Sequence, residues 1–81
     1  MPEENLVRKE VEYFINEKLY DEGIHPSVIV KFTKEVNQDI DKAVGEIWME
    51  EITPKAEEKA KEIIERNRNV LNKLKEAIEV E

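Results

Sequence analysis

The 81-residue sequence contains no cysteine, only two glycines and a single histidine. Without cysteine, neither a disulfide framework nor a thiolate metal site can support the fold. His25 cannot form a zinc site alone, so no metal or other cofactor is implied. A domain of this size buries only about 60% of the surface that its unfolded chain exposes. Side-chain packing must therefore stabilise one domain, residues 1–81, without a disulfide or a metal ion.

The sequence also has no excess of basic residues and no long apolar run. The formal net charge of −7 opposes the phosphate neutralisation on which nucleic-acid affinity depends, and it disfavours anionic membrane surfaces. The longest apolar runs, "YFI" and "VIV", are too short to span a bilayer. The first residues, "MPEEN", lack the basic and apolar regions of a signal peptide. We expect a soluble chain that binds neither nucleic acid nor membranes, and its location stays unknown.

Charged and hydrophobic residues make up 41% and 40% of the sequence. Their order has the period of an α-helix. The first helix is predicted from about residue 2 to residue 22. Five apolar residues share one face of its 3.6-residue period: Val7, Val11, Phe14, Ile15 and Leu19. Gly23 is expected to end this helix in a left-handed conformation, with Ile24 making the apolar contact of a Schellman cap.

Two further helices follow from the same pattern, over residues of about 26–51 and 54–80. The second begins at "HPSV", where Pro26 suits the first helical position and His25 or Ser27 would be the N-cap. The third begins at "TPKAEE", with Thr53 as the expected N-cap and Pro54 behind it. Their apolar residues repeat every three or four positions, so each helix has one core face.

These three helices predict an all-α fold, an up-down-up three-helix bundle. The connection near Ile52 and Thr53 is short and contains no glycine. A tight hairpin is therefore one interpretation of that junction, and a bent or splayed arrangement of the last two helices is the other.

No constellation of residues predicts catalysis. Asp21, His25 and Ser27 are residue types of a nucleophilic triad, but a surface turn supplies neither a rigid scaffold nor an oxyanion site. The segment "DIDKAVGEIWME" resembles a calcium loop only in part, because its fifth place is Ala43 and Gly45 comes one residue too late. We therefore expect no catalytic residue, no metal ligand and no enzyme activity.

Several apolar residues miss the predicted core faces. Leu6, Tyr13 and Tyr20 recur every seven residues, on a side of the first helix about 160° from the core face. Trp48, Met49 and Ile52 lie on the flank or the outer side of the second helix. Tyr, Trp and Met are enriched at protein–protein interfaces, so these six residues are the predicted protein interface. The alternative is that Leu6, Trp48, Met49 and Ile52 meet at one end of the bundle, where they close the core as a lid.

Gly45 and the asparagines around residue 67 are further irregularities in the helical pattern. Gly45 weakens a helix interior by about 1 kcal/mol relative to Ala, which would make sense where another backbone or a large side chain comes close. Asn67 points toward the core and could specify helix register, as a buried amide can. Asn69 and Asn72 are expected on the surface, where they could belong to a polar contact area.

The whole chain resembles de novo designed helical miniproteins made to bind a chosen protein. The resemblance rests on "MPEEN", "DEGIHPS" and "EITPKAEE" as idealised start and stop signals, with Glu/Lys-rich faces and no cysteine. It implies a recombinant, rigid scaffold that displays one face to a target. It carries over no functional position, because it contains no diagnostic motif.

The leading hypothesis is a non-catalytic protein-binding module whose target the sequence does not identify. We expect the free chain to be a monomer in preference to a homo-oligomer. The alternative is a self-associating structural bundle with no separate target, in which the exposed apolar stripe forms a symmetric contact. A small acidic domain with a regulatory partner is a third interpretation.

Overall fold

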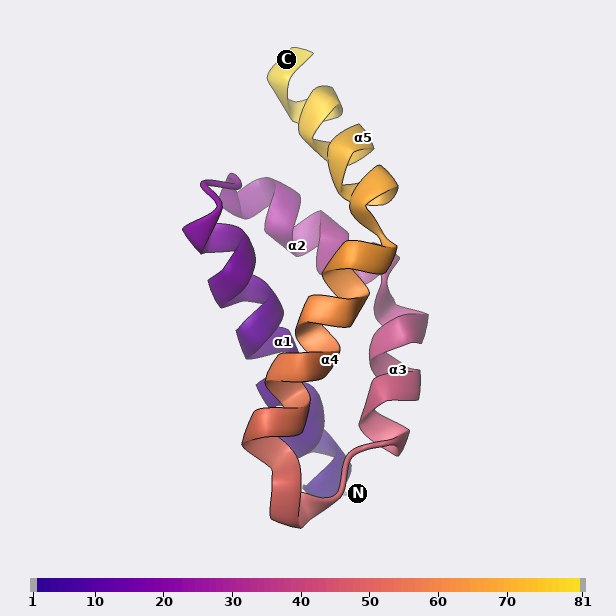
Figure 1. Ribbon diagram of the computed structural model, residues 1–81. Helices are drawn as coiled ribbons and strands as arrows, with labels where there is room; N and C mark the ends of the chain where they lie inside the picture. Colours follow the sequence, from indigo (N-terminus) through magenta and orange to yellow (C-terminus); the bar gives the residue numbers. More distant parts are fainter. Residues whose placement is uncertain (1, 81) are drawn as a thin grey trace.

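The structure, a computed structural model, describes residues 2–80 of the chain, with side chains from residue 4 to residue 78. This part is all-helical, as predicted, but the three-helix bundle is wrong. Two of the expected long helices are each divided, so the described residues form five α-helices and one 3₁₀ turn (Figure 1). They are α1 (Pro2–Asp21), α2 (Pro26–Glu35), α3 (Asn37–Gly45), η1 (Met49–Glu51), α4 (Ile52–Arg66) and α5 (Arg68–Val80).

The turn between α1 and α2 follows its local sequence signals. Gly23 has a φ of +80°, and its N–H donates to Tyr20 O at 2.9 Å. The N–H of Ile24 donates to Leu19 O at 3.0 Å, which completes the predicted Schellman motif. His25 is the N-cap of α2, because its Nδ1 accepts from the Ser27 N–H at 3.0 Å. The sequence had predicted either His25 or Ser27 as this N-cap.

The predicted second helix bends at Val36, where the backbone leaves the helical region at φ −96° and ψ 20°. Helical hydrogen bonds reach the bend from both sides, since Val36 N donates to Phe32 O and Ile40 N donates to Val36 O, both at 3.0 Å. Thr33 Oγ1 donates to Ile29 O at 2.7 Å, one turn back, and such a contact often bends a helix. As a result, α2 and α3 run in different directions (Figure 1).

The predicted third helix bends at Asn67, at φ −114° and ψ 27°. Asn67 Nδ2 donates at 2.8 Å both to Ile63 O, one turn back, and to Asp39 Oδ2 in the first turn of α3. The backbone N–H of Asn67 donates to the same Ile63 oxygen at 3.1 Å, so a side chain competes for the helical ladder. Asn67 is half-buried, and its amide joins this bend to α3. The register role considered from the sequence stays a prediction.

The connection between α3 and α4 lies earlier than predicted. It consists of residues 46–48 and η1, and Ile52 is already helical at φ −52° and ψ −50°. Thr53 is therefore in the first turn of α4, and Glu51 occupies the cap position without a side-chain hydrogen bond. The chain reverses direction over residues 46–51, since α3 descends and α4 rises (Figure 1), and not through a tight turn at Ile52 and Thr53. Lys59 Nζ, on α4, lies 3.1 Å from Glu46 Oε1 just after α3, and this contact raises the pKa of Lys59.

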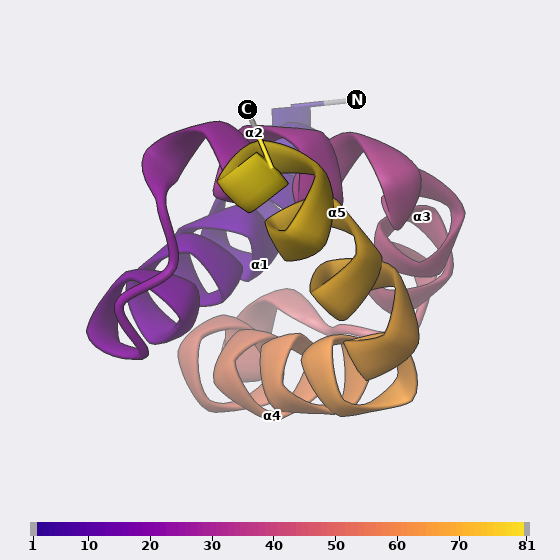
Figure 2. The same cartoon turned by 90° about the horizontal axis from the view of Figure 1, so that it is seen from above.

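All five helices contribute to one hydrophobic core. α1 packs along α4, where the fully buried Ala56 and Ala60 leave room for its close approach, and it also contacts α3 and α2. α5 instead packs on α2, and Figure 2 shows it over that helix, with α4 on the opposite side of the molecule. The largest fully buried side chains are Phe32, Ile15, Leu19, Ile40, Ile64 and Leu71. The result is an elongated body of 43 × 21 × 20 Å.

Gly45 has no close neighbour in the described part of the chain, so the close approach expected there stays a prediction. It is the last residue of α3, and a Cβ placed on it would have no atom within 4 Å. No backbone or large side chain therefore requires the missing Cβ, and its φ is not positive.

The two glycines should respond oppositely to alanine. Gly45→Ala should raise the free energy of unfolding by about 0.5 kcal/mol, because it reduces the conformational freedom of the unfolded chain at a compatible position. Gly23→Ala should lower it by about 1 kcal/mol, because a left-handed residue with a Cβ is strained. Urea denaturation of both variants measures these changes. A destabilised Gly45→Ala protein would contradict the open surroundings of that residue.

Candidate functional site

The residues predicted to form the interface are mostly on the surface. Tyr13, Tyr20 and Trp48 are 56%, 70% and 72% exposed, so the outward orientation expected for the two tyrosines is observed. The alternative that Trp48 closes the end of the core is wrong, since most of its surface faces solvent. Leu6 and Met49 are also exposed. Ile52 is half-buried at the start of α4, so its expected outward position on the second helix is only partly correct.

Tyr13 and Tyr20 line a groove between α1 and α2, with a volume of about 810 Å³. The opposite wall comes from α2, where Val30 is 56% exposed and Ile29 is buried. Pro26, in the first turn of α2, lines the groove near Tyr20's end of α1. Both helices contribute apolar surface to this hollow. We call it the α1–α2 groove.

The ring of Tyr13 is held in the groove by a neighbouring aromatic side chain. The ring of Tyr13 meets the half-buried Phe14 edge to face, with 5.3 Å between ring centroids and 76° between planes. Such a contact is worth about 1 kcal/mol beyond area burial, and Phe14 in turn packs on the core. A hydrogen bond with Glu17, one turn further along α1, raises the pKa of the Tyr13 phenol.

Arg8 closes the end of the groove away from the α1–α2 turn. Its guanidinium is held by Glu12 Oε2 at 3.1 Å on the same helix, and by the side chains of Asp41 and Asn37 across the groove. Arg8 therefore ties the first half of α1 to the bend between α2 and α3. It also separates the α1–α2 groove from a second hollow, because it lines both.

Trp48 and Met49 line that second hollow, of about 550 Å³, between the start of α1 and the end of α3. Glu4, Asn5 and Asp41 also contribute to it, so its surroundings are more polar than those of the first groove. The fold therefore does not join the two predicted patches into one apolar surface. Leu6 lines neither hollow.

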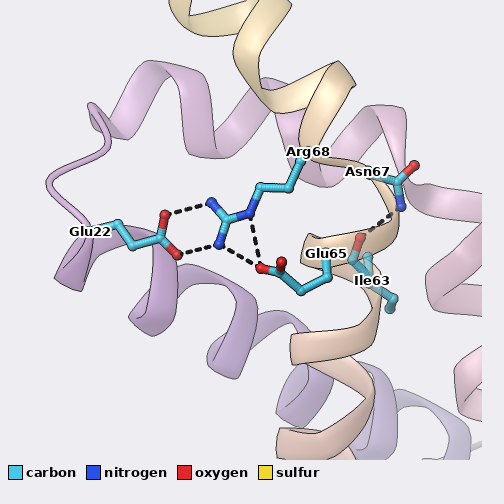
Figure 3. Close-up of polar contacts among 5 residues, drawn as sticks. All are labelled: Glu22, Ile63, Glu65, Asn67 and Arg68. Atoms are coloured by element: carbon cyan, nitrogen blue, oxygen red, sulfur yellow. Dashed lines mark hydrogen bonds and ion pairs between the residues drawn. The ribbon is translucent and has the colours of Figure 1, made fainter.

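The other end of the groove is braced by Arg68, at the start of α5 (Figure 3). Its Nη1 and Nη2 atoms donate to the two carboxylate oxygens of Glu22 at 2.7 and 2.9 Å. Its Nε and Nη2 atoms also donate to Glu65 Oε2 at 2.9 and 2.7 Å. Because Glu22 belongs to the turn between the groove walls, this pair ties that turn to the bend at Asn67. The hydrogen bonds lower the pKa of Glu22 and raise that of Arg68.

The α2 wall of the groove was not predicted from the sequence. Val30 and Pro26 were not among the predicted interface residues. A signal was present, because Pro26 and Val30 are four residues apart on one side of α2, directly after the turn that returns the chain along α1. Pairing that side with Tyr13 and Tyr20 would have indicated the groove.

Other kinds of site receive no structural support in the described part of the chain. Residues 2–80 contain no group of three acidic, histidine or cysteine side chains placed to hold a metal ion. None of their helices combines the length and apolar character that crossing a membrane requires. Of the suspected triad, His25 and Ser27 share the cap of α2. Comparisons with protein-family models, curated proteins and solved structures found no match for this chain.

The Arg68–Glu22 pair predicts a pH-dependent stability. Both side chains are more than one third exposed, so we expect a coupling of only about 0.5–1 kcal/mol at pH 7 from a double-mutant cycle with Arg68→Met and Glu22→Gln. Because folding lowers the pKa of Glu22 from its ordinary value of 4.5, the coupling should be complete above that pH. It should disappear as the pH falls through the lowered pKa.

Arg66→Met provides the matched control, because Arg66 is exposed and forms no ion pair with any described side chain. It should change the free energy of unfolding by less than about 0.5 kcal/mol, with no added pH dependence. An Arg68–Glu22 coupling that stays constant from pH 7 to pH 2 would contradict the assignment.

Proposed function

We propose that the chain is a non-catalytic protein-binding module, of the designed kind that its sequence resembles, and that it presents the α1–α2 groove to a protein target. The observation that supports this proposal is the lining of one groove by Tyr13, Tyr20 and Val30, all more than half exposed. Tyrosine gives a large contact area at a low entropic cost, and its hydroxyl pairs with polar groups at an interface.

The surroundings of the groove agree with binding without catalysis. Arg8 and Arg68 hold its two ends through contacts between different helices, so little ordering energy would be needed when a partner docks. The groove is open to water along its length, whereas a catalytic site works best when it excludes water. Its titratable side chains are exposed or half-buried, and none is enclosed.

Selection from a displayed library of peptides tests this function. Peptides enriched on the wild-type chain should lose most of their binding to Tyr20→Glu and Val30→Glu variants, because a charge then lies in the apolar groove. The same substitutions should shift the free energy of unfolding by less than about 0.5 kcal/mol, since both side chains are exposed. Lys61→Glu, at an exposed position on α4, is the control and should leave binding unchanged. If every enriched peptide binds all variants equally, the groove is not the binding surface.

A self-associating bundle is the second candidate, and the exposure of Trp48 and Met49 on a separate face favours it. Light scattering over a concentration series separates the two. We expect the wild-type chain to remain monomeric, because a net charge of −7 on each copy opposes association. An average mass that rises with concentration, and that returns to the monomer value in Trp48→Ala, would support self-association through that face.

A further inference from the structure

The backbone of the groove walls limits what can occupy the groove. Both walls are α-helices, whose N–H and C=O groups are already used within the helix. Residues 2–80 contain no strand, so they offer an extended peptide no sheet edge with which to pair. A segment that docks here must satisfy its own backbone groups, and an α-helix does so.

The dimensions of the groove agree with a short helix. The α1 wall extends from Arg8 to Tyr20, which is about 18 Å at 1.5 Å per residue. A partner helix of roughly 12 residues covers that length. Its apolar residues, spaced at i, i+3 or i+4 and i+7, would face the tyrosines of one wall and Val30 of the other.

The charges of the two walls differ in sign. On the α1 wall, Glu12 is paired with Arg8 at 3.1 Å, so these two charges cancel. Glu17 lies on the same wall and forms no ion pair with a described side chain; on the α2 wall the same is true of Lys34. Both are exposed. The groove therefore presents one uncompensated negative charge along α1 and one uncompensated positive charge along α2.

From these observations we propose that the α1–α2 groove binds an amphipathic helix with one basic and one acidic flank beside its apolar stripe. The inference rests on the proposed function and specifies the chemistry of the partner. The basic flank lies along α1, near Glu17, and the acidic flank lies along α2, near Lys34. Turning such a helix end for end exchanges its flanks, so the two charges also fix the direction in which it binds.

Three synthetic helical peptides test the charge pattern. They share one leucine stripe and carry a basic and an acidic flank, two basic flanks or two acidic flanks. In fluorescence anisotropy titrations at low salt, wild type should bind the mixed peptide about two- to fivefold more tightly than the others. Glu17→Lys should move the preference to the acidic peptide, and Lys34→Glu should move it to the basic one. In 0.5 M NaCl, where the Debye length is about 4 Å, the differences should shrink.

Neutral variants keep the test independent of any strain from charge reversal. Glu17→Gln and Lys34→Gln should each reduce the preference for the mixed peptide without reversing it, and circular dichroism should confirm that all variants are folded. A mixed peptide with two central prolines, which cannot be helical, should not bind. Equal binding of that peptide would overturn the helical occupant.

The outcomes separate this inference from the proposed function. If the peptides bind wild type but not Tyr20→Glu, and yet rank identically on the wild-type, Glu17→Lys and Lys34→Glu proteins, the groove binds helices and the charge pattern is wrong. If binding is the same with and without Tyr20→Glu, the groove itself is wrong, and the proposed function fails too. A mass that doubles with concentration in wild type but not in Tyr20→Glu would identify a second copy of the chain as the occupant and overturn the inference.

Discussion

The fold depends on the burial of one side of α1 against α4. Val11, Ile15 and Leu19 are fully buried on that helix, and on α4 Ala56 and Ala60 allow the two backbones to lie close together. A fully buried aliphatic side chain contributes about 1.5–3 kcal/mol, so this contact supplies a large share of the stability of so short a chain. Because the inner side of α1 is occupied in this way, its tyrosines can only lie on the outer side, facing α2.

Polar contacts then place the second wall of the groove. The bends at Val36 and Asn67 turn α2 and α5 away from the directions of α3 and α4, and Asn67 joins the two bends through Asp39. Arg68 adds the tie to Glu22 in the turn between the groove walls (Figure 3). Exposed pairs of this kind contribute little energy individually, but they are directional and select one arrangement of helices that the apolar core alone would leave less defined.

The sequence predicted those features that local chemistry determines. Gly23, with Ile24 behind it, has the pattern of a Schellman cap, and Pro26 has that of a helix start; both are where they were expected. The bends were not predictable in this way, because the apolar period continues unbroken through Phe32, Val36 and Ile40. Their polar contacts also join residues far apart in sequence, such as Asn67 and Asp39. Helical geometry predicted that the tyrosines point outward. The groove could not be predicted without knowing the direction in which α2 runs.

All side chains that line the α1–α2 groove lie between residue 8 and residue 37. Under the proposed function, the second half of the chain is a scaffold that supports the groove and contributes none of its lining. Its solvent-facing positions on α4 and α5 can be altered to change net charge, attach a label or tether the protein to a surface. Such changes leave every side chain that lines the groove in place, so the chemistry of the groove and the handling properties of the protein can be altered separately.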